Sequence, residues 1–335
     1  MTVTECPSCG QPAATGDAFC EYCGAELAPA VVSDAAPGFV PSCPVCSVAG
    51  ISAGVTVDGY CESCGRKVPT GRDHIELDLG LLVGVTDRGL RHPRNEDAMA
   101  LATASTSAGQ AAIVVVCDGV SSSPRPDEAS LTGAEAAVRV LLEAVRMGDE
   151  LQEASRDAVH DASVALNALA GPGGAPSATY AAAVVSEGVV TLSWLGDSRV
   201  YWLTESESQL LTTDDSLAQE MIASGLFDEA TAMASPQAHV ITRWLGADNE
   251  TPEAHVIQFT PPGPGVLLVC TDGLWNYQAE AADLAALVMP GALTDSAGAA
   301  DVLLKFALDA GGMDNITAVL VPYPLNSPRS ASSDE

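Results

Sequence analysis

The sequence predicts an α+β fold in which two antiparallel sheets pack face to face and are covered by helices. Two runs of mostly branched apolar residues, 113–117 and 266–270, are typical of strands buried on both faces, and an Asp-Gly pair closes each run. Other predicted strands are near neighbours joined by tight turns such as 186–188, which favours antiparallel pairing. Segments with helical apolar spacing lie between the strand sets.

Each element is expected from its own apolar pattern. Strands are expected at residues 81–86, 99–102, 111–117, 180–185, 189–195, 200–203, 255–259, 266–270 and 316–321. Helices are expected at residues 129–147, 150–170, 216–224, 281–288 and 297–310, with a break between the first two at Gly148 and Asp149. The buried stripe of the first helix should be Leu131, Ala134, Val138, Leu141, Leu142 and Val145.

The composition favours a globular chain that does not bind nucleic acids or membranes. Among 335 residues, 47% are hydrophobic, and no run reaches the roughly eighteen apolar residues that a membrane span needs. The net charge of −30 opposes binding to DNA or anionic lipid, because such binding depends on neutralising phosphates. It also attracts divalent cations, although its main role is expected to be solubility. The N-terminus shows no secretory signal, so a cytoplasmic location is expected.

Eight of the ten cysteines occur in Cys-x2-Cys pairs. Two pairs separated by a short loop match the spacing of a four-thiolate zinc site. Disulfides are the alternative, but they fit poorly with a chain that lacks a visible secretion signal. Two structural zinc ions are therefore expected, one at Cys6, Cys9, Cys20 and Cys23 and one at Cys43, Cys46, Cys61 and Cys64. The remaining Cys117 and Cys270 are predicted core residues.

The chain divides into segments of different character. Two zinc-ribbon-like modules are expected at 1–26 and 42–68, each too small for a core and therefore dependent on metal for folding. Residues 27–41, rich in alanine and proline, are expected to be a linker. The main domain is predicted at 77–323, and the serine-rich residues 324–335 are predicted to be disordered.

Four aspartates, Asp118, Asp197, Asp272 and Asp314, lie at the ends of predicted strands. Each motif is weak alone, because Asp-Gly is a common turn dipeptide. Together they suggest carboxylates that converge at one edge of the sheets. Such carboxylates repel one another unless cations lie between them. The pattern therefore predicts a site for hard metals that prefer oxygen ligands.

The order of these motifs resembles the metal-dependent protein phosphatases of the type 2C (PPM) family, particularly the bacterial ones. The matching segments are Gly89 with Asn95-Glu96-Asp97, then 116–119, 196–199, 213–216 with Gly225, 270–275 and 312–317. The resemblance covers residues 80–322. It implies a four-layer α-β-β-α sandwich with a two-metal site at one end.

The resemblance also implies roles for individual residues. Asp118 would bridge two ions, and the carbonyl of Gly119 would help to bind the first. Asp272 and Asp314 would hold the second ion, while Glu96 and Asp97 would act largely through bound waters. Asp197 matches the position of a weaker third metal. Ligation by oxygen alone fits Mg²⁺ or Mn²⁺.

The implied activity is hydrolysis of phosphoserine and phosphothreonine in proteins, by direct attack of a hydroxide that bridges the two metals. Two cations lower the pKa of such a water and neutralise the phosphate oxygens. No covalent nucleophile is needed, in agreement with the absence of a Cys-x5-Arg motif. The expected partners are phosphorylated proteins produced by a serine/threonine kinase.

The sequence departs from the family pattern at several places. His92 stands where the family has an arginine for the substrate phosphate, so Arg91 or Arg94 are further candidates for this contact. Val120-Ser121-Ser122 replaces the usual Met-Gly-Gly that follows Asp-Gly, and no histidine follows until His160, so no general acid is assigned. Asp214 belongs to the family's flap region, where it would either affect substrate access or begin a helix.

Two functions other than catalysis are compatible with parts of the sequence. The altered positions His92 and Ser121 would suit a catalytically weak or inactive binding module on the same fold, but all the direct metal aspartates are retained. A zinc-ribbon protein that binds nucleic acid is opposed by the acidic charge. The cysteine modules would serve as structural caps, redox-sensitive elements or, as we favour, protein-docking modules that select the substrate.

Overall fold

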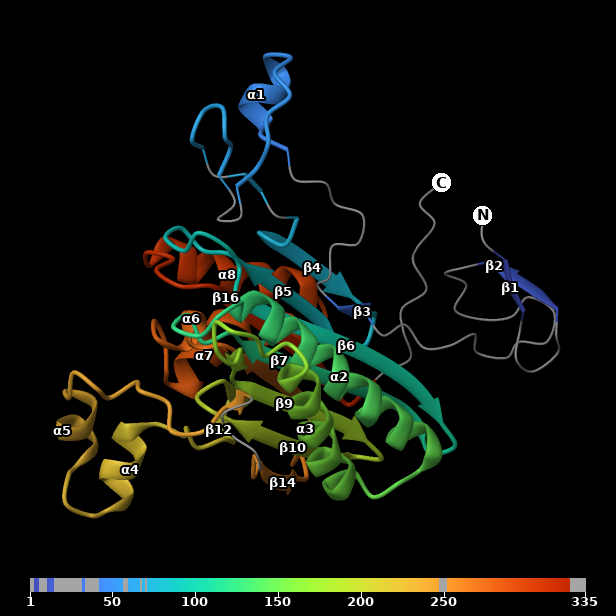
Figure 1. Cartoon of the computed structure of the whole chain (residues 1–335). Helices are drawn as coiled ribbons and strands as arrows, with labels where there is room; N and C mark the ends of the chain where they lie inside the picture. The colour runs from blue at the N-terminus through green and yellow to red at the C-terminus, as the bar shows by residue number, and fades with distance from the viewer. Residues whose placement is uncertain are drawn as a thin grey trace.

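The computed structural model describes residues 3–5, 11–14, 32–33, 42–56, 60–66, 68–69, 71–246 and 252–325. Two six-stranded antiparallel sheets form the centre of the molecule, and helices cover the outer face of each (Figure 1). This arrangement confirms the predicted α-β-β-α sandwich.

The first sheet has the strand order β14-β10-β9-β7-β6-β3. Its strands are β14 (His255–Phe259), β10 (Val189–Leu195), β9 (Tyr180–Ser186), β7 (Gly109–Asp118), β6 (Asp97–Thr106) and β3 (Val32–Ser33). The second sheet has the order β12-β11-β15-β16-β5-β4. Its strands are β12 (Gln209–Leu210), β11 (Arg199–Leu203), β15 (Gly265–Cys270), β16 (Ile316–Tyr323), β5 (Val83–Asp87) and β4 (His74–Asp78).

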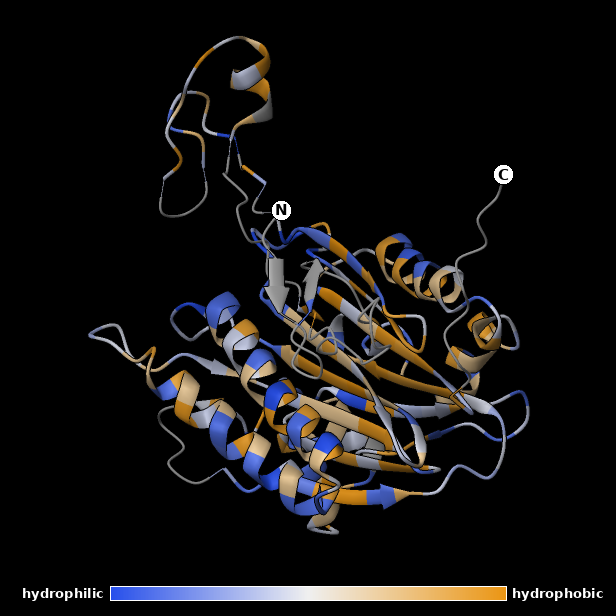
Figure 2. Ribbon diagram, turned by 90° about the vertical axis from the view of Figure 1, so that its right-hand side faces the viewer, coloured by the Kyte–Doolittle hydropathy of each residue, from blue (hydrophilic) through white to orange (hydrophobic). Residues whose placement is uncertain are grey.

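Strand β7 is apolar from Ala111 to Cys117 because both of its faces are buried over this stretch. Ile113, Val115 and Cys117 pack into the core under the first pair of helices. The alternate residues 112, 114 and 116 pack into the core between the two sheets. Strand β15 divides its residues in the same way, with Cys270 facing the helices on the other side. Figure 2 shows apolar residues along the strands of these inner layers. Both cysteines outside the Cys-x2-Cys pairs are therefore core residues, as predicted.

Long helices form the outer layers. Helices α2 (Pro126–Met147) and α3 (Leu151–Asn167) cover the first sheet, and the predicted buried stripe of α2 faces it, with Leu131 only partly buried. Helices α7 (Ala281–Val288) and α8 (Ser296–Asp309), with the short 3₁₀ turn η1 (Gly291–Leu293), cover the second sheet. None of the helices described is both long and apolar enough to cross a membrane.

Smaller elements complete the sandwich. Helix α6 (Asp272–Trp275) follows β15 directly, and β8 (Ser177–Ala178) pairs with β13 (Leu245–Gly246). Residues 211–244, here called the flap, contain α4 (Leu217–Ala223) and α5 (Glu229–Met233) and extend beyond the layers (Figure 1). The helix expected at 216–224 is α4, which begins after an N-cap at Ser216 whose hydroxyl accepts from Gln219 N at 3.3 Å.

The N-terminal part differs from the expected segments in two places. Strand β3 lies inside the segment expected to be a linker, and it pairs with β6 through Leu101 and Ala100. Strand β4 begins before residue 77, where the main domain was expected to start. Its alternating pattern leaves every other side chain exposed, because it is an edge strand, so no apolar run marks it. Further elements described here are β1 (Val3–Glu5), β2 (Pro12–Ala14) and α1 (Pro44–Val48). The predicted disordered tail lies outside the described residues from residue 326 onward.

Candidate active site and metal centres

Carboxylates gather where strands from both sheets end. Asp97 begins β6 and lies opposite Asp118, the last residue of β7, in the antiparallel register. Asp272 is the first residue of α6, directly after β15, and Asp314 precedes β16, the neighbour of β15. Asp197 lies between β10 and β11, in the connection that passes from one sheet to the other.

Asp97 is held by hydroxyl groups from the opposite sheet. Its Oδ2 accepts hydrogen bonds from Thr271 Oγ1 at 2.8 Å and from Thr317 Oγ1 at 2.7 Å. Its Oδ1 is buried and has no hydrogen-bond partner among the described residues. One oxygen is therefore fixed by the protein and the other remains available to a ligand.

Asp118 is fixed through its backbone. Its N–H donates to Thr179 Oγ1 at 3.0 Å, and its carbonyl accepts from Thr179 N at 2.8 Å. The hydroxyls of Thr179 and Ser198 are 2.8 Å apart, so this threonine links the end of β7 to the loop that holds Asp197.

Gly119 occupies a position that no larger residue could take. Its N–H donates to the carbonyl of Glu96 at 3.0 Å. A Cβ at this position would collide with the carbonyl oxygens of Pro126 and Glu96. The glycine therefore lets the start of α2 approach the end of β7, which the Asp-Gly pattern alone did not reveal.

Glu96 is buried and its carboxylate is held from two sides. Arg94 Nε donates to Oε1 at 3.0 Å, and Ser121 Oγ donates to Oε2 at 2.5 Å. Arg94 Nη1 is also 3.4 Å from Asp127 Oδ1, at the start of α2. Ser121, one of the departures from the family pattern, thus contacts a predicted site residue.

Two asparagines connect the segments that carry the carboxylates. Asn315 Oδ1 accepts from Glu96 N at 2.7 Å, while its Nδ2 donates to the carbonyls of Arg88 and Arg94. Asn95 Nδ2 donates to Thr86 Oγ1 at 2.8 Å. The sequence motifs contain both asparagines but do not indicate these contacts, and they give no role to Thr179, Thr271 or Thr317. A polar residue within an otherwise apolar strand was the available signal at Thr317.

The basic candidates for the substrate phosphate differ in their surroundings. His92 Nε2 is 3.1 Å from Asp314 Oδ1, so it lies beside the carboxylates. Arg91 is exposed and forms no ion pair with the described residues. Arg94 is engaged with Glu96 and Asp127.

The base of the flap is fixed next to Asp197. Arg199 is 8% exposed and binds Asp214 through two parallel hydrogen bonds, Nε to Oδ1 at 2.9 Å and Nη2 to Oδ2 at 2.7 Å. Its guanidinium carbon lies 3.7 Å from the ring centre of Trp275, whose Nε1 donates to Asp197 O at 2.9 Å. Asp214 therefore does not begin α4; it anchors the flap.

Burial and mutual repulsion raise the pKa values of the clustered carboxyls. Burial raises the pKa of Asp97 to about 8, with smaller contributions from the charges of Asp314 and Asp272, although its two hydroxyl donors oppose the shift. Burial likewise raises the pKa of Asp272 to about 6. The pKa of Asp118 rises well above its usual range, because the group is buried and surrounded by the other carboxylates. The pKa of Asp197 is raised in the same way.

This donor set fits divalent cations. Two buried carboxylate oxygens, Asp97 Oδ1 and Asp272 Oδ1, have no hydrogen-bond partner among the described residues. Both are therefore available to bind a cation. Clustered carboxylates that resist ionisation gain most from positive charge between them. Among the described residues, no set of three or more carboxylates brings its oxygens as close together as the four sulfurs of the cysteine cluster described below. Wider spacing suits Mg²⁺ or Mn²⁺, which keep several water ligands.

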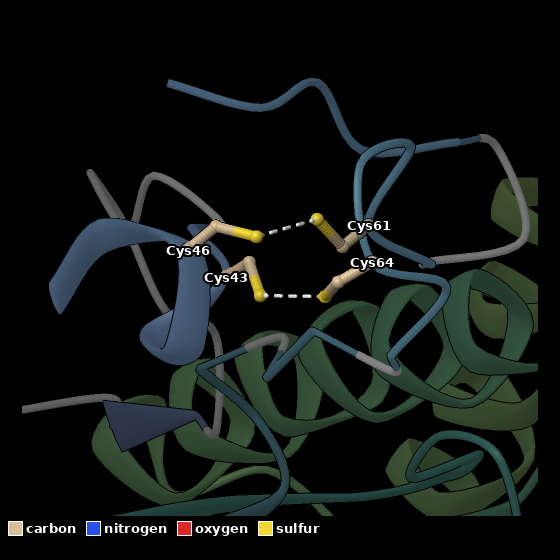
Figure 3. Close-up of side chains that lie close together, drawn as sticks. All are labelled: Cys43, Cys46, Cys61 and Cys64. Carbon is tan, nitrogen blue, oxygen red and sulfur yellow. Dashed lines mark hydrogen bonds between the residues drawn. The ribbon is translucent and has the colours of Figure 1, made fainter. Parts of the chain in front are cut away.

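A second ligand cluster lies in the N-terminal region. The sulfurs of Cys43, Cys46, Cys61 and Cys64 all lie within 4.8 Å of one another. Figure 3 shows Cys43 facing Cys64 and Cys46 facing Cys61, at sulfur–sulfur distances of 3.5 and 3.6 Å. All four are free thiols rather than disulfides. A hydrogen bond from the backbone of Cys46 lowers the pKa of Cys43 to about 7, which favours its thiolate, whereas burial raises the pKa of Cys46 to about 12.

A family model described as protein phosphatase 2C matches residues 90–301, which include Glu96, Asp118, Asp197 and Asp272. The chain belongs to the protein phosphatase 2C family. The resemblance inferred from the order of motifs is confirmed. Asp314 lies just beyond the matched residues.

Bacterial members of the phosphatase 2C family are similar to this chain. The serine/threonine phosphatase stp of Listeria innocua is 30% identical over 251 residues, or 70% of this chain and 93% of that protein. The structure of PstP/Ppp from Mycobacterium tuberculosis is similar with a TM-score of 0.58 and 25% identity, covering 73% of this chain and 98% of that one. The catalytic domain of PstP in complex with two manganese ions gives a TM-score of 0.56 and 25% identity, covering 71% and 96%.

A second family model, described as a zinc-ribbon domain, matches residues 3–27. This span corresponds to the first expected cysteine module. Its cysteines, Cys6, Cys9, Cys20 and Cys23, lie outside the described residues. The N-terminal part of this phosphatase 2C family member thus contains a zinc-ribbon domain followed by a four-thiol cluster.

Proposed function

We propose that this chain is a metal-dependent serine/threonine protein phosphatase that hydrolyses phosphoserine and phosphothreonine. The convergence of Asp97, Asp118, Asp272 and Asp314 at one end of the sandwich carries the proposal, because cations between these carboxylates offset the burial and the mutual repulsion that raise the pKa of Asp118. Membership of the protein phosphatase 2C family and the name of the Listeria relative support it. The likeness to a relative that holds two manganese ions supports Mn²⁺ or Mg²⁺ as the metal.

In this proposal the carboxylates divide the cation binding among them. Asp118 and the Gly119 carbonyl would hold the first ion, with Asp118 shared by the second, which Asp272 and Asp314 complete. Glu96 and Asp97 would orient water around the ions, and Asp197 would serve a third, weaker site. When bound, the ions supply an activated water and neutralise the phosphate oxygens. The protein's own residues hold the carboxylates in place. Two threonine hydroxyls donate to Asp97, and Asn315 accepts from the backbone of Glu96.

Turnover of p-nitrophenyl phosphate with and without Mn²⁺ tests the activity. We expect metal-dependent turnover in the natural chain and a loss of at least about a hundredfold in Asp272→Ala, the scale of a lost electrostatic group in a catalytic site. The matched control is Asp283→Ala, which removes a carboxylate from the first turn of α7. Absence of metal-dependent turnover in the natural chain would instead favour a non-catalytic binding protein on this fold.

We also propose that Arg91 and His92 contact the substrate phosphate. Their positions support this, because Arg91 is exposed and His92 lies beside Asp314, whereas Arg94 is engaged with Glu96. Arg91→Ala should raise KM for a phosphopeptide with little change in Mn²⁺ dependence. A normal KM in Arg91→Ala and His92→Ala alike would show that another group binds the phosphate.

The N-terminal modules are proposed to hold two zinc ions and to dock protein substrates, the products of a serine/threonine kinase. The four clustered thiols support zinc, and the exposed Val48 and Ile51 beside them support docking. Val48→Asp with Ile51→Asp should slow dephosphorylation of a phosphoprotein but not of p-nitrophenyl phosphate. An equal loss on both would contradict docking. We further propose the predicted order of two cysteine modules and one main domain, with β3 and β4 added to the sheets of the main domain. A cytoplasmic location, without a nucleic-acid or membrane partner, is also proposed.

A further inference from the structure

Arg72, which follows the second cysteine module in the sequence, contacts the active-site end of the sandwich. Its Nη2 donates to the carbonyl oxygen of Asp97 at 2.7 Å, and its Nη1 donates to that of Asp127 at 3.0 Å. Its own carbonyl accepts from Asn95 Nδ2 at 3.1 Å. One side chain thus holds together the start of β6 and the first turn of α2.

A second arginine closes a ring with these contacts. Asp127 also meets Arg94 Nη1 at 3.4 Å, and Arg94 Nε donates to Glu96 at 3.0 Å. Arg94 therefore links Glu96 to Asp127 of α2, and Arg72 links Asp97 to the same residue. Because Asp97 faces Asp118 across the β6–β7 pair, this ring joins the first turn of α2 to the strand ends that carry the carboxylates.

These contacts are not needed to dock β4 onto the second sheet. That strand begins at His74 and pairs fully with β5, and Arg88 N donates to the Asp73 carbonyl at 2.8 Å. Arg72 lies before this ladder and reaches toward the other sheet. A planar guanidinium can donate to two carbonyl oxygens at once, whereas a lysine ammonium is a single point of contact.

We propose that Arg72 is a positioning residue for the metal centre and that it sets the affinity of the site for divalent cations. It acts through the backbone of Asp97 and does not contact the substrate. The inference rests on the proposed metal-dependent function. It also assigns a role in the active site to a residue outside the matched span of residues 90–301.

Calorimetric titration of the full-length chain with Mn²⁺ tests this role. Arg72→Ala should bind Mn²⁺ roughly tenfold more weakly, the scale of losing hydrogen bonds from a charged donor, and Arg72→Lys should fall between the two. The Mn²⁺ concentration for half-maximal turnover should shift by the same factor. At saturating Mn²⁺, kcat and KM for p-nitrophenyl phosphate should return to the natural values. Arg139→Ala, an equal charge change on the exposed face of α2, should alter neither quantity.

Each other outcome has a definite meaning. Unchanged Mn²⁺ affinity in Arg72→Ala, even with a lower Tm, would reduce Arg72 to a structural role and overturn the proposal. If Arg72→Ala does not fold, natural affinity in Arg72→Lys overturns it equally. Mn²⁺ binding without turnover in the natural chain would overturn the proposed function alone, because the affinity comparison remains. Absence of Mn²⁺ binding in the natural chain would overturn both.

Discussion

Asp97 depends on hydroxyl groups that carry no metal-binding signal of their own. Thr271 would be expected to cap α6, yet its hydroxyl donates to Asp97 instead, and Thr317 does the same from β16. The carboxylate is thereby oriented before any ligand arrives. Because the side chain is already held in place, less conformational entropy is lost when a ligand binds.

Ser121 has a comparable role beside Glu96. Ser121→Ala removes the 2.5 Å hydrogen bond to Oε2 and leaves Arg94 as the remaining side-chain donor. We expect kcat to fall about fivefold, which corresponds to roughly 1 kcal/mol for one hydrogen bond. Steady-state kinetics at several Mn²⁺ concentrations measures this, with the exposed Ser122→Ala as control. Equal rates in both variants would show that Glu96 does not need this donor.

The raised pKa values make cation binding depend on pH. A carboxyl whose pKa lies near 8 or 6 retains protons near neutrality, and an entering cation must displace them. Mn²⁺ affinity should therefore rise as the pH increases from about 6 to about 8, and binding at pH 7 should release protons. Calorimetry in two buffers of different ionisation enthalpy counts these protons, and Asp97→Asn should release fewer. Identical heats in both buffers would contradict the raised values.

At the scale of elements, the flap is held by a nearly buried ion pair. Asp214→Ala removes the bidentate partner of Arg199 and leaves this buried guanidinium with its hydrogen bond to the Tyr201 hydroxyl and its contact with the Trp275 ring. Removing one partner of such a pair costs about 3 kcal/mol or more. Urea unfolding should show this loss, and limited proteolysis should cut the flap sooner. The control Asp228→Ala removes only the exposed N-cap of α5 and should cost about 1 kcal/mol. Similar losses in the two variants would argue against an anchoring role.

A helix or strand can be predicted from the sequence where its own residues form a recognisable apolar pattern. All expected strands and helices are present. Burial between helices and a second sheet demands apolar residues in 111–117 of β7 and 266–270 of β15, and these runs are visible in the sequence. β4 was missed because an edge strand exposes alternate side chains, and α6 because one turn of helix has no periodicity. The strand-end aspartates were likewise visible. Their partners Thr179, Asn315 and Arg72 were not, because hydrogen bonds across the fold leave no local pattern.

At the scale of the whole molecule, the cysteine cluster and the sandwich have separate cores. The cluster packs only with Ala53, Val55 and Val68 among the described residues. If zinc holds it together, as proposed, a chelator should abolish amide protection in residues 42–66 and leave the strands of the sandwich protected. Hydrogen exchange with and without chelator measures both regions. Loss of protection throughout β7 and β15 would show that the two cores fold as one.

The two-residue strand β3 has a consequence for the long strand beside it. A sheet edge presents unpaired backbone groups that can recruit a strand from another molecule. Val32 and Ser33 pair with part of β6, and Ser33 Oγ donates to Glu135 on α2 at 2.7 Å, which fastens the short strand in place. Val32 and Ser33 therefore occupy the edge of β6 at Ala100 and Leu101, so a strand from another copy would have to displace them before pairing there.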